Sequence, residues 1–99
     1  MASHARFGAL EWTRGGHPLE RKKAAADALT LLTFEPGFED PNWCTNGHVI
    51  HVLEGRLGLK LDGQELRVDA GDACRVEQGE RHRAFNAGEQ PVKLFVWSY

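Results

Sequence analysis

The spacing of glycine in the later part of the chain is the feature that most limits what this sequence can fold into. From Gly37 onward, glycines recur at positions 47, 55, 58, 63, 71, 79 and 88, and short apolar stretches lie between them. Turns and strands that alternate at such short intervals are typical of an all-β sandwich or barrel. We therefore expect an all-β fold.

Residues 56–62 show the strand pattern most clearly, because leucines alternate there with polar residues or glycine. A period of two indicates a strand, whereas a helix would show a period near 3.6. Asp62-Gly63 predicts a hairpin turn, since glycine accepts a positive φ angle. The alternation of Leu66 and Val68 with polar residues predicts the return strand. Further strands are expected at 29–34, 74–76, 82–86 and 92–97.

The first 28 residues are interpreted as an N-terminal arm before a single domain over residues 29–99. Residues 19–28 contain Arg, Lys and three consecutive alanines, which have high helical propensity, but they lack a clear apolar stripe. A short helix and an extended edge segment are both open for this stretch. Phe7, Leu10 and Trp12 are large apolar residues in a polar context. They are suited to cover a barrel end or to contact a partner subunit.

Length and charge exclude several classes of protein. A chain of 99 residues is one domain, because it is too short for a second domain to bury a core of its own. Its 12 basic and 14 acidic residues leave a formal net charge of −2, so nucleic acid is not an expected partner. No apolar run approaches the roughly 20 residues of a membrane span. Residues 1–10 lack the apolar region of a secretory signal, so the cytoplasm is the expected location.

The chain contains two cysteines, Cys44 and Cys74, which are fewer than a disulfide-stabilised scaffold of this size normally carries. We expect reduced thiols. Cys74 shares the apolar face of a short strand with Val76, so it is interpreted as a core residue rather than a ligand. A Cys44–Cys74 disulfide stays open as an alternative.

The strongest motif covers residues 71–86 and consists of Gly71, Gly79, His82 and Asn86. Their spacing resembles that of the second cupin motif, G-x5-P-x-G-x2-H-x3-N, with Glu77 in place of the proline. Gly79 permits a tight turn, so His82 is expected to start a strand and point inward. Asn86 is expected to fix a turn or strand edge by hydrogen bonding.

The first cupin motif, G-x5-H-x-H-x3-4-E-x6-G, is altered in this chain. If its last glycine is Gly55, the two histidine positions hold Asn42 and Cys44, and the glutamate position holds His48. The resemblance to the family then covers residues 29–99. It implies a small single-domain cupin: a double-stranded β-helix, or jelly roll, of two antiparallel sheets.

In typical cupins these positions bind one divalent metal ion, so the resemblance implies Cys44, His48 and His82 as metal ligands. We expect the loop 45–47 to place Cys44 directly across from His48, with Cβ atoms about 4.5–5.5 Å apart. Thiolate and imidazole ligands suit zinc, copper or nickel, and iron is also open. Asn42 is a candidate for a weak fourth ligand.

Other readings of these residues stay open. The histidines can be hydrogen-bonded groups of a barrel that has lost its metal, and Cys44 can be a buried apolar thiol. His51 is three residues from His48, on the opposite strand face, and is excluded from the site. His4 and His17 are interpreted as solvated arm residues. No clear general base stands out besides the ligands; Glu77 and Glu80 flank the second motif, and solvated side chains are an open reading of both. Trp43 is expected beside the site.

The site is expected inside the barrel, lined by Phe34, Ile50, Val52, Leu59, Val76 and Phe95. A mostly apolar pocket with a few polar groups suits a small organic ligand. Two functions follow: a metal-dependent enzyme, or a metal-free or non-catalytic cupin that binds or senses a ligand. Fold alone does not decide whether the protein is an enzyme. Similar single-domain cupins commonly form homodimers, which implies a homodimer here.

Overall fold

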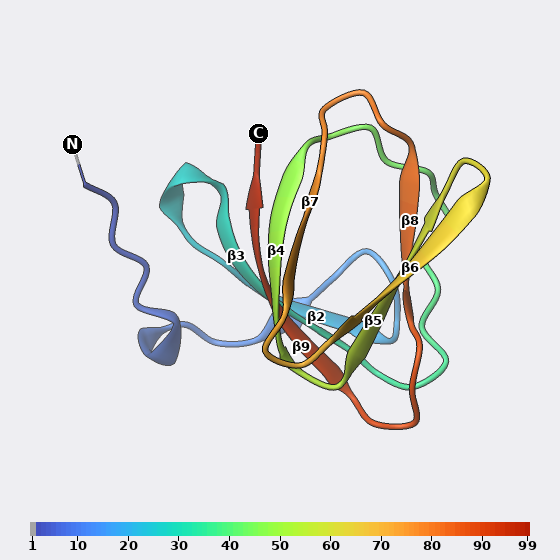
Figure 1. The fold of residues 1–99 in the computed structure, drawn as a ribbon. Helices are drawn as coiled ribbons and strands as arrows, with labels where there is room; N and C mark the ends of the chain where they lie inside the picture. Colours follow the sequence, from blue (N-terminus) through green and yellow to red (C-terminus); the bar gives the residue numbers. More distant parts are fainter. Residues whose placement is uncertain (1) are drawn as a thin grey trace.

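The structure is a computed structural model that describes residues 2–99, and nearly all of its regular elements are strands (Figure 1). The strands are β1 (Thr13–Arg14), β2 (Glu20–Ala24), β3 (Leu29–Phe34), β4 (His48–Glu54), β5 (Arg56–Leu61), β6 (Gln64–Asp69), β7 (Ala73–Val76), β8 (His82–Asn86) and β9 (Val92–Ser98). Two 3₁₀ turns, η1 (Phe7–Ala9) and η2 (Ala26–Ala28), lie in the N-terminal part.

The strands form two antiparallel sheets that pack on each other. The larger sheet has the order β1-β2-β3-β9-β4-β7, and the smaller has the order β6-β5-β8. Chain neighbours β4 and β5 lie in different sheets, and the smaller sheet covers one face of the larger (Figure 1). This is the jelly-roll arrangement, so the predicted all-β, double-stranded β-helix fold is confirmed.

The core lies between the two sheets and follows the alternation in the sequence. Leu57, Leu59 and Leu61 of β5 are buried, as the period of two predicts. The hairpin from β5 to β6 turns at Asp62-Gly63, where Gly63 has a φ angle of 77°. From the other sheet, Val92, Leu94 and Val96 of β9 face the same core.

That register in β9 corrects one prediction. Phe95 was expected to line the site, but it lies on the opposite face of β9, because Leu94 and Val96 on either side of it point inward. The Phe95 ring instead packs edge-on against Phe7, with ring centroids 6.2 Å apart. The aromatic residue of the N-terminal segment therefore covers the outside of the larger sheet.

The N-terminal segment joins the larger sheet through two strands. Residues 20–24 are β2, so the extended alternative for residues 19–28 is the one found, followed only by the short turn η2. The division of the chain at residue 28 into arm and barrel stays a prediction, although β1 and β2 pair with the barrel. Within residues 2–99, no helix has the length and hydropathy needed to cross a bilayer.

Gly58 on β5 is required by an aromatic ring that lies over it. Its strand partner on β8 is Phe85, and a Cβ atom on Gly58 would lie 2.1 Å from that ring. Lys60 and Arg67 approach the same ring, at 5.5 Å and 5.6 Å from its centroid, and limit its room to move. The glycine that interrupts the leucine alternation is therefore a packing position.

We predict that Gly58→Ala destabilises the protein by about 1–3 kcal/mol, because the added methyl group displaces the Phe85 ring. Gly8→Ala is the matched control, since nothing lies within 4 Å of a Cβ atom at Gly8. Urea unfolding monitored by tryptophan fluorescence measures both. Equal stability of the two variants would contradict this account of Gly58.

Candidate metal centre

Residues 38–45 bring one side of the candidate site into place by running along β8. The backbone of Cys44 donates to His82 at 2.9 Å and accepts from it at 3.0 Å. Closer to the core, Asp40 N–H donates to the carbonyl of Ala84 at 2.9 Å. This segment therefore acts as an irregular extra strand beside the smaller sheet, although most of it has no regular secondary structure.

This pairing corrects the expected hairpin. Cys44 does not lie across from His48; its backbone partner is His82. The loop does not close a hairpin because Gly47 pairs with Tyr99 instead, through hydrogen bonds of 3.0 Å and 2.9 Å. The Tyr99 ring occupies the space next to Gly47, 2.5 Å from where a Cβ atom would be.

The three predicted ligand residues nevertheless converge. One donor atom from each of Cys44, His48 and His82 lies within 4.8 Å of the other two. Cys44 Sγ is 3.7 Å from His48 Nε2, and the two imidazole rings meet edge to face with centroids 4.9 Å apart. His82 is only 4% exposed. The larger sheet, the smaller sheet and the segment 38–45 each contribute one donor.

Hydrogen bonds at the far side of each ring orient the two imidazoles. His82 Nδ1 is 3.0 Å from the carbonyl oxygen of Glu80, which can only accept, so Nδ1 is the donor; in the neutral ring this leaves the lone pair on Nε2. His48 Nδ1 is 2.9 Å from Ser98 Oγ, and its Nε2 faces Cys44. Metal-binding histidines usually have such a partner on the other ring nitrogen.

The donors lie in an inner pocket of about 130 Å³ between the sheets. Its apolar wall comprises Leu32, Phe34, Ile50, Leu57, Leu59, Ala84, Leu94 and Val96. The predicted lining by Phe34, Ile50 and Leu59 is thus found, whereas Val52 and Val76 are buried in the core without lining this pocket. Glu20 and Asp40 are the carboxylate residues of the lining.

An outer pocket of about 350 Å³ shares Glu20, Asp40 and Cys44 with the inner one. Asn42, the candidate fourth ligand, lines this outer pocket and not the inner pocket that holds the three donors. Trp43 also lines it, as expected for a residue beside the site; it is 39% exposed, and the Arg81 guanidinium lies 4.3 Å from its ring centroid. The entrance is therefore more polar and aromatic than the interior.

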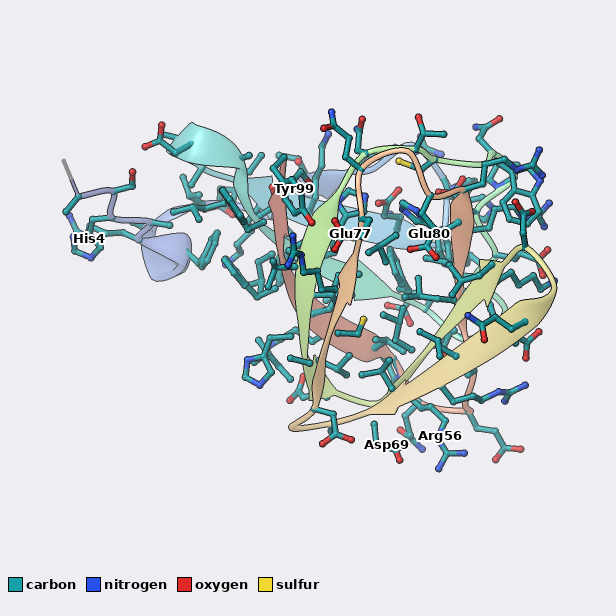
Figure 2. The ribbon with its side chains drawn as sticks, turned by 45° about the horizontal axis from the view of Figure 1, so that its top comes forward. His4, Arg56, Asp69, Glu77, Glu80 and Tyr99 are labelled. Atoms are coloured by element: carbon teal, nitrogen blue, oxygen red, sulfur yellow. The ribbon has the colours of Figure 1, made fainter. Side chains whose placement is uncertain are left out.

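Several residues weighed in the sequence lie apart from the donor group. His51 is exposed on β4, and His4 lies far out on the N-terminal segment (Figure 2). Glu77 and Glu80 have exposed side chains at the loop between β7 and β8 (Figure 2). His17, interpreted as solvated, instead packs edge-on against Phe38, with centroids 5.1 Å apart, and lines the outer pocket.

The remaining predicted roles are structural. Both cysteines are free, so the alternative of a Cys44–Cys74 disulfide is not found. Cys74 packs against the core, and burial raises the pKa of its thiol. The Asn86 amide donates to the carbonyls of Phe34 at 3.1 Å and Gln90 at 2.8 Å, which confirms its role in fixing a strand edge.

Sequence reasoning missed the two carboxylate residues of the pocket. Glu20 belongs to no motif and lies in a stretch of ambiguous secondary structure, and Asp40 precedes the altered first motif. Both reach the site through long-range pairing: Glu20 through β3, and Asp40 through β8. Residues 20–23 are all charged and do not alternate with apolar residues, so the sequence carries no local signal for the inward orientation of Glu20.

The fold and the three converging donors define a small jelly-roll protein with a metal-type donor cluster in an interior pocket. The chain belongs to the cupin domain family, whose profile matches residues 30–98. The family predicted from the two motifs is therefore confirmed.

Individual relatives agree with this membership. The chain is 33% identical over 45 residues to the tetracenomycin polyketide synthase protein TcmJ of Streptomyces glaucescens, covering 46% of this chain and 30% of that protein. An uncharacterised protein of Methanocaldococcus jannaschii is 31% identical over 56% of this chain and 44% of its own length. The matched segments thus span less than half of either curated relative.

Solved structures show the same fold. The polyketide cyclase RemF of Streptomyces resistomycificus is 26% identical, with a TM-score of 0.72 over 99% of this chain and 80% of that chain. A sugar phosphate isomerase of the cupin superfamily from Silicibacter pomeroyi is 19% identical, with a TM-score of 0.74 over 95% of this chain and 73% of that chain. At 19% identity, the second likeness concerns the fold alone.

We predict that the metal-free protein loses stability as the pH falls below about 6.5, the ordinary imidazole value. Burial lowers the pKa of His48, and the nearby His82 lowers it further. Folded His48 therefore binds a proton less readily than unfolded His48, so acid favours the unfolded chain until the pH passes below the lowered pKa. Urea unfolding with a chelator present, over a pH series, measures this.

The control is His48→Gln, which removes the titrating group but keeps an amide that can hydrogen bond. Its free energy of unfolding is expected to vary less with pH than that of the wild type over the same range. Identical pH dependence in the two proteins would show that His48 does not contribute.

Proposed function

We propose that this cupin binds one divalent metal ion through Cys44, His48 and His82 and acts on a small organic molecule in the inner pocket. The observation that carries the proposal is the convergence of three donors whose other hydrogen-bonding groups are already engaged. A histidine pair in a core that served packing alone would not need two ring nitrogens and a thiol directed at one point.

The donor spacing fits a tetrahedral ion. With bonds of about 2.3 Å to sulfur and about 2.0 Å to nitrogen, a tetrahedral angle places the two donors about 3.5 Å apart. The distance from Cys44 Sγ to His48 Nε2 is 3.7 Å. Three protein ligands leave a fourth position for water or substrate, as in catalytic zinc sites. The thiolate favours zinc, copper or nickel over the harder ions.

When bound, such an ion polarises a substrate oxygen or activates water. The chain supplies the remaining conditions. The apolar wall excludes bulk water, the Glu80 carbonyl and Ser98 hold the imidazoles in place, and the polar entrance admits the substrate. The relatives TcmJ and RemF favour a polyketide-type compound rich in carbonyl groups as the substrate.

The alternative proposal is a non-catalytic or metal-free cupin that binds or senses a ligand. The small volume of the inner pocket, about 130 Å³, supports this alternative, because only part of a larger ligand fits there. The two proposals differ first in metal content, which is therefore the deciding measurement.

We predict about one metal ion per chain in protein purified without a polyhistidine tag and reconstituted with zinc, iron(II), nickel, copper or manganese. His82→Ala is expected to lose the most metal, because His82 is the most buried of the three ligands. His51→Ala is the matched control, since His51 is exposed on the same strand as His48, and its metal content should be unchanged. Elemental analysis measures all of them.

Alkylation of Cys44 tests independently whether this thiol binds the metal. A coordinated thiolate is shielded, so Cys44 should react more slowly before a chelator removes the metal than after it. Wild-type metal content below about a tenth of an equivalent with every ion tested would refute metal binding. Equal Cys44 labelling in loaded and chelated protein would refute this ligand assignment.

We also propose that the chain forms a homodimer. The support is its exposed apolar side chains: Leu10, Trp12, Leu53 and Trp97 are 37–42% exposed, and the Trp97 ring lies beside Tyr99 at 5.3 Å. Burying such groups between two copies removes apolar surface from water.

Light scattering should therefore give about twice the 11.1 kDa chain mass. Trp97→Ser should shift the protein towards the monomer, while Leu53→Ser tests a second exposed position. A mass near that of one chain over a wide range of protein concentration would contradict the proposal.

A further inference from the structure

Glu20, the first residue of β2, is directed at the pocket by strand register. It pairs with Phe34 of β3, and directly opposed residues share a face of the sheet. Phe34 is 3% exposed and lines the inner pocket, so Glu20 lies on the same inward side. An acidic residue thus shares one small apolar cavity with the donor cluster of Cys44, His48 and His82.

Two glycines hold the Glu20 carboxylate in this position. Gly16 N–H donates to Glu20 Oε1 at 3.0 Å, and a Cβ atom on Gly15 would lie 2.5 Å from Glu20 Cδ. A methyl group at Gly15 would therefore require the Glu20 carboxylate to shift from this position. No Lys, Arg or His of residues 2–99 forms an ion pair with Glu20. The group is therefore held by the backbone rather than neutralised by a cation.

The surroundings of Glu20 favour its protonated form more than water does. Burial raises the pKa of its carboxyl group, and the negative charge of Asp40 raises it further. The Gly16 hydrogen bond, Lys22 and His17 act in the opposite direction on that pKa, but the net shift is upward. A carboxyl group shifted toward neutral pH is suited to accept and return a proton.

We infer that Glu20 is the proton-transfer residue of this pocket and that the substrate is a carbonyl compound with a C–H bond next to its carbonyl group. The inference rests on the proposed function. In the step, the Glu20 carboxylate takes the proton from that carbon. The C–H electron pair becomes a C=C bond, and the C=O π pair moves to oxygen, which gives an enolate. Return of the proton from Glu20 to the enolate oxygen gives the enol, which completes the isomerisation.

The two pockets set the size of what can react. The inner pocket, at about 130 Å³, corresponds to roughly four water molecules of about 30 Å³ each. It therefore takes only the reacting end of a substrate. The outer pocket, at about 350 Å³, holds the remainder, and Glu20 and Asp40 line both. A carboxylate at this boundary meets the carbon next to a carbonyl group that enters the inner pocket.

The probe for this reaction is pentane-2,4-dione, whose enol and keto forms interconvert by this proton transfer. An enol-rich solution in a water-miscible aprotic solvent is diluted into buffer, and the loss of enol absorbance is followed with zinc-loaded protein, chelated protein and buffer alone. We expect zinc-loaded wild type to accelerate the approach to equilibrium and Glu20→Gln to lose about a hundredfold of that acceleration. Glu35→Gln, an exposed carboxylate at the end of the paired strand β3, is the matched control and should keep the wild-type rate.

Two measurements that do not depend on turnover accompany the assay. Glu20→Gln should bind as much zinc as the wild type, since Glu20 lies outside the donor group. Metal-free Glu20→Gln should be at least as stable as the wild type at neutral pH, because the amide still accepts from Gly16 N–H and carries no charge to desolvate.

These results distinguish proton transfer by Glu20 from a metal-binding role and from a structural role. Loss of zinc from Glu20→Gln would make Glu20 a metal ligand, and loss of stability would make it a structural residue; either overturns the inference. A zinc-loaded wild type that is no faster than Glu20→Gln, or no faster than buffer, overturns it as well. Wild type that takes up no metal at all instead refutes the proposed function, and it does so before any rate is measured.

Discussion

Two reciprocal backbone hydrogen bonds between Cys44 and His82 hold the irregular segment 38–45 against the smaller sheet, and the rest of the site depends on them. They set Cys44 beside β8 while His48 stays on β4 of the larger sheet. Without this pairing, Cys44 would be a loop residue with no fixed relation to either histidine, whereas Asp40 is held separately by its own hydrogen bond to the carbonyl of Ala84. The donor cluster is thus a product of backbone pairing across the end of the sandwich.

Most of the fold was predictable because its signals are local. The alternation in residues 56–62, the Asp62-Gly63 turn and the glycine spacing each act within a few residues, and the structure shows the expected strands there. The face of β9 was harder, because residues 92–97 are almost all apolar and only Lys93, which shares a strand face with Phe95, marks that side as outward. Phe95 was misplaced for that reason, and the choice is settled by packing between sheets.

The candidate site was also predicted only in part. The spacing of the motifs identified Cys44, His48 and His82. It gives their positions in the sequence but not which backbone segments hydrogen bond to each other. The predicted Cys44–His48 hairpin was wrong because the backbone N–H and C=O groups of Gly47 bond to Tyr99, more than fifty residues away. Glu20 was not recognised at all, since its inward orientation depends on register with Phe34. Contacts between distant segments are what short sequence patterns do not encode.

Because the donors come from opposite layers, a metal ion on Cys44, His48 and His82 would also act as a mechanical link between them. At this end of the sandwich, the loops 38–47 and 77–81 run between the two sheets (Figure 1). An ion would oppose the separation of the layers at this end, and any widening of the sandwich would stretch its bonds. Separation of the two sheets and loss of the metal would then be coupled. A substitution far from the ligands that loosens the core would also weaken metal binding.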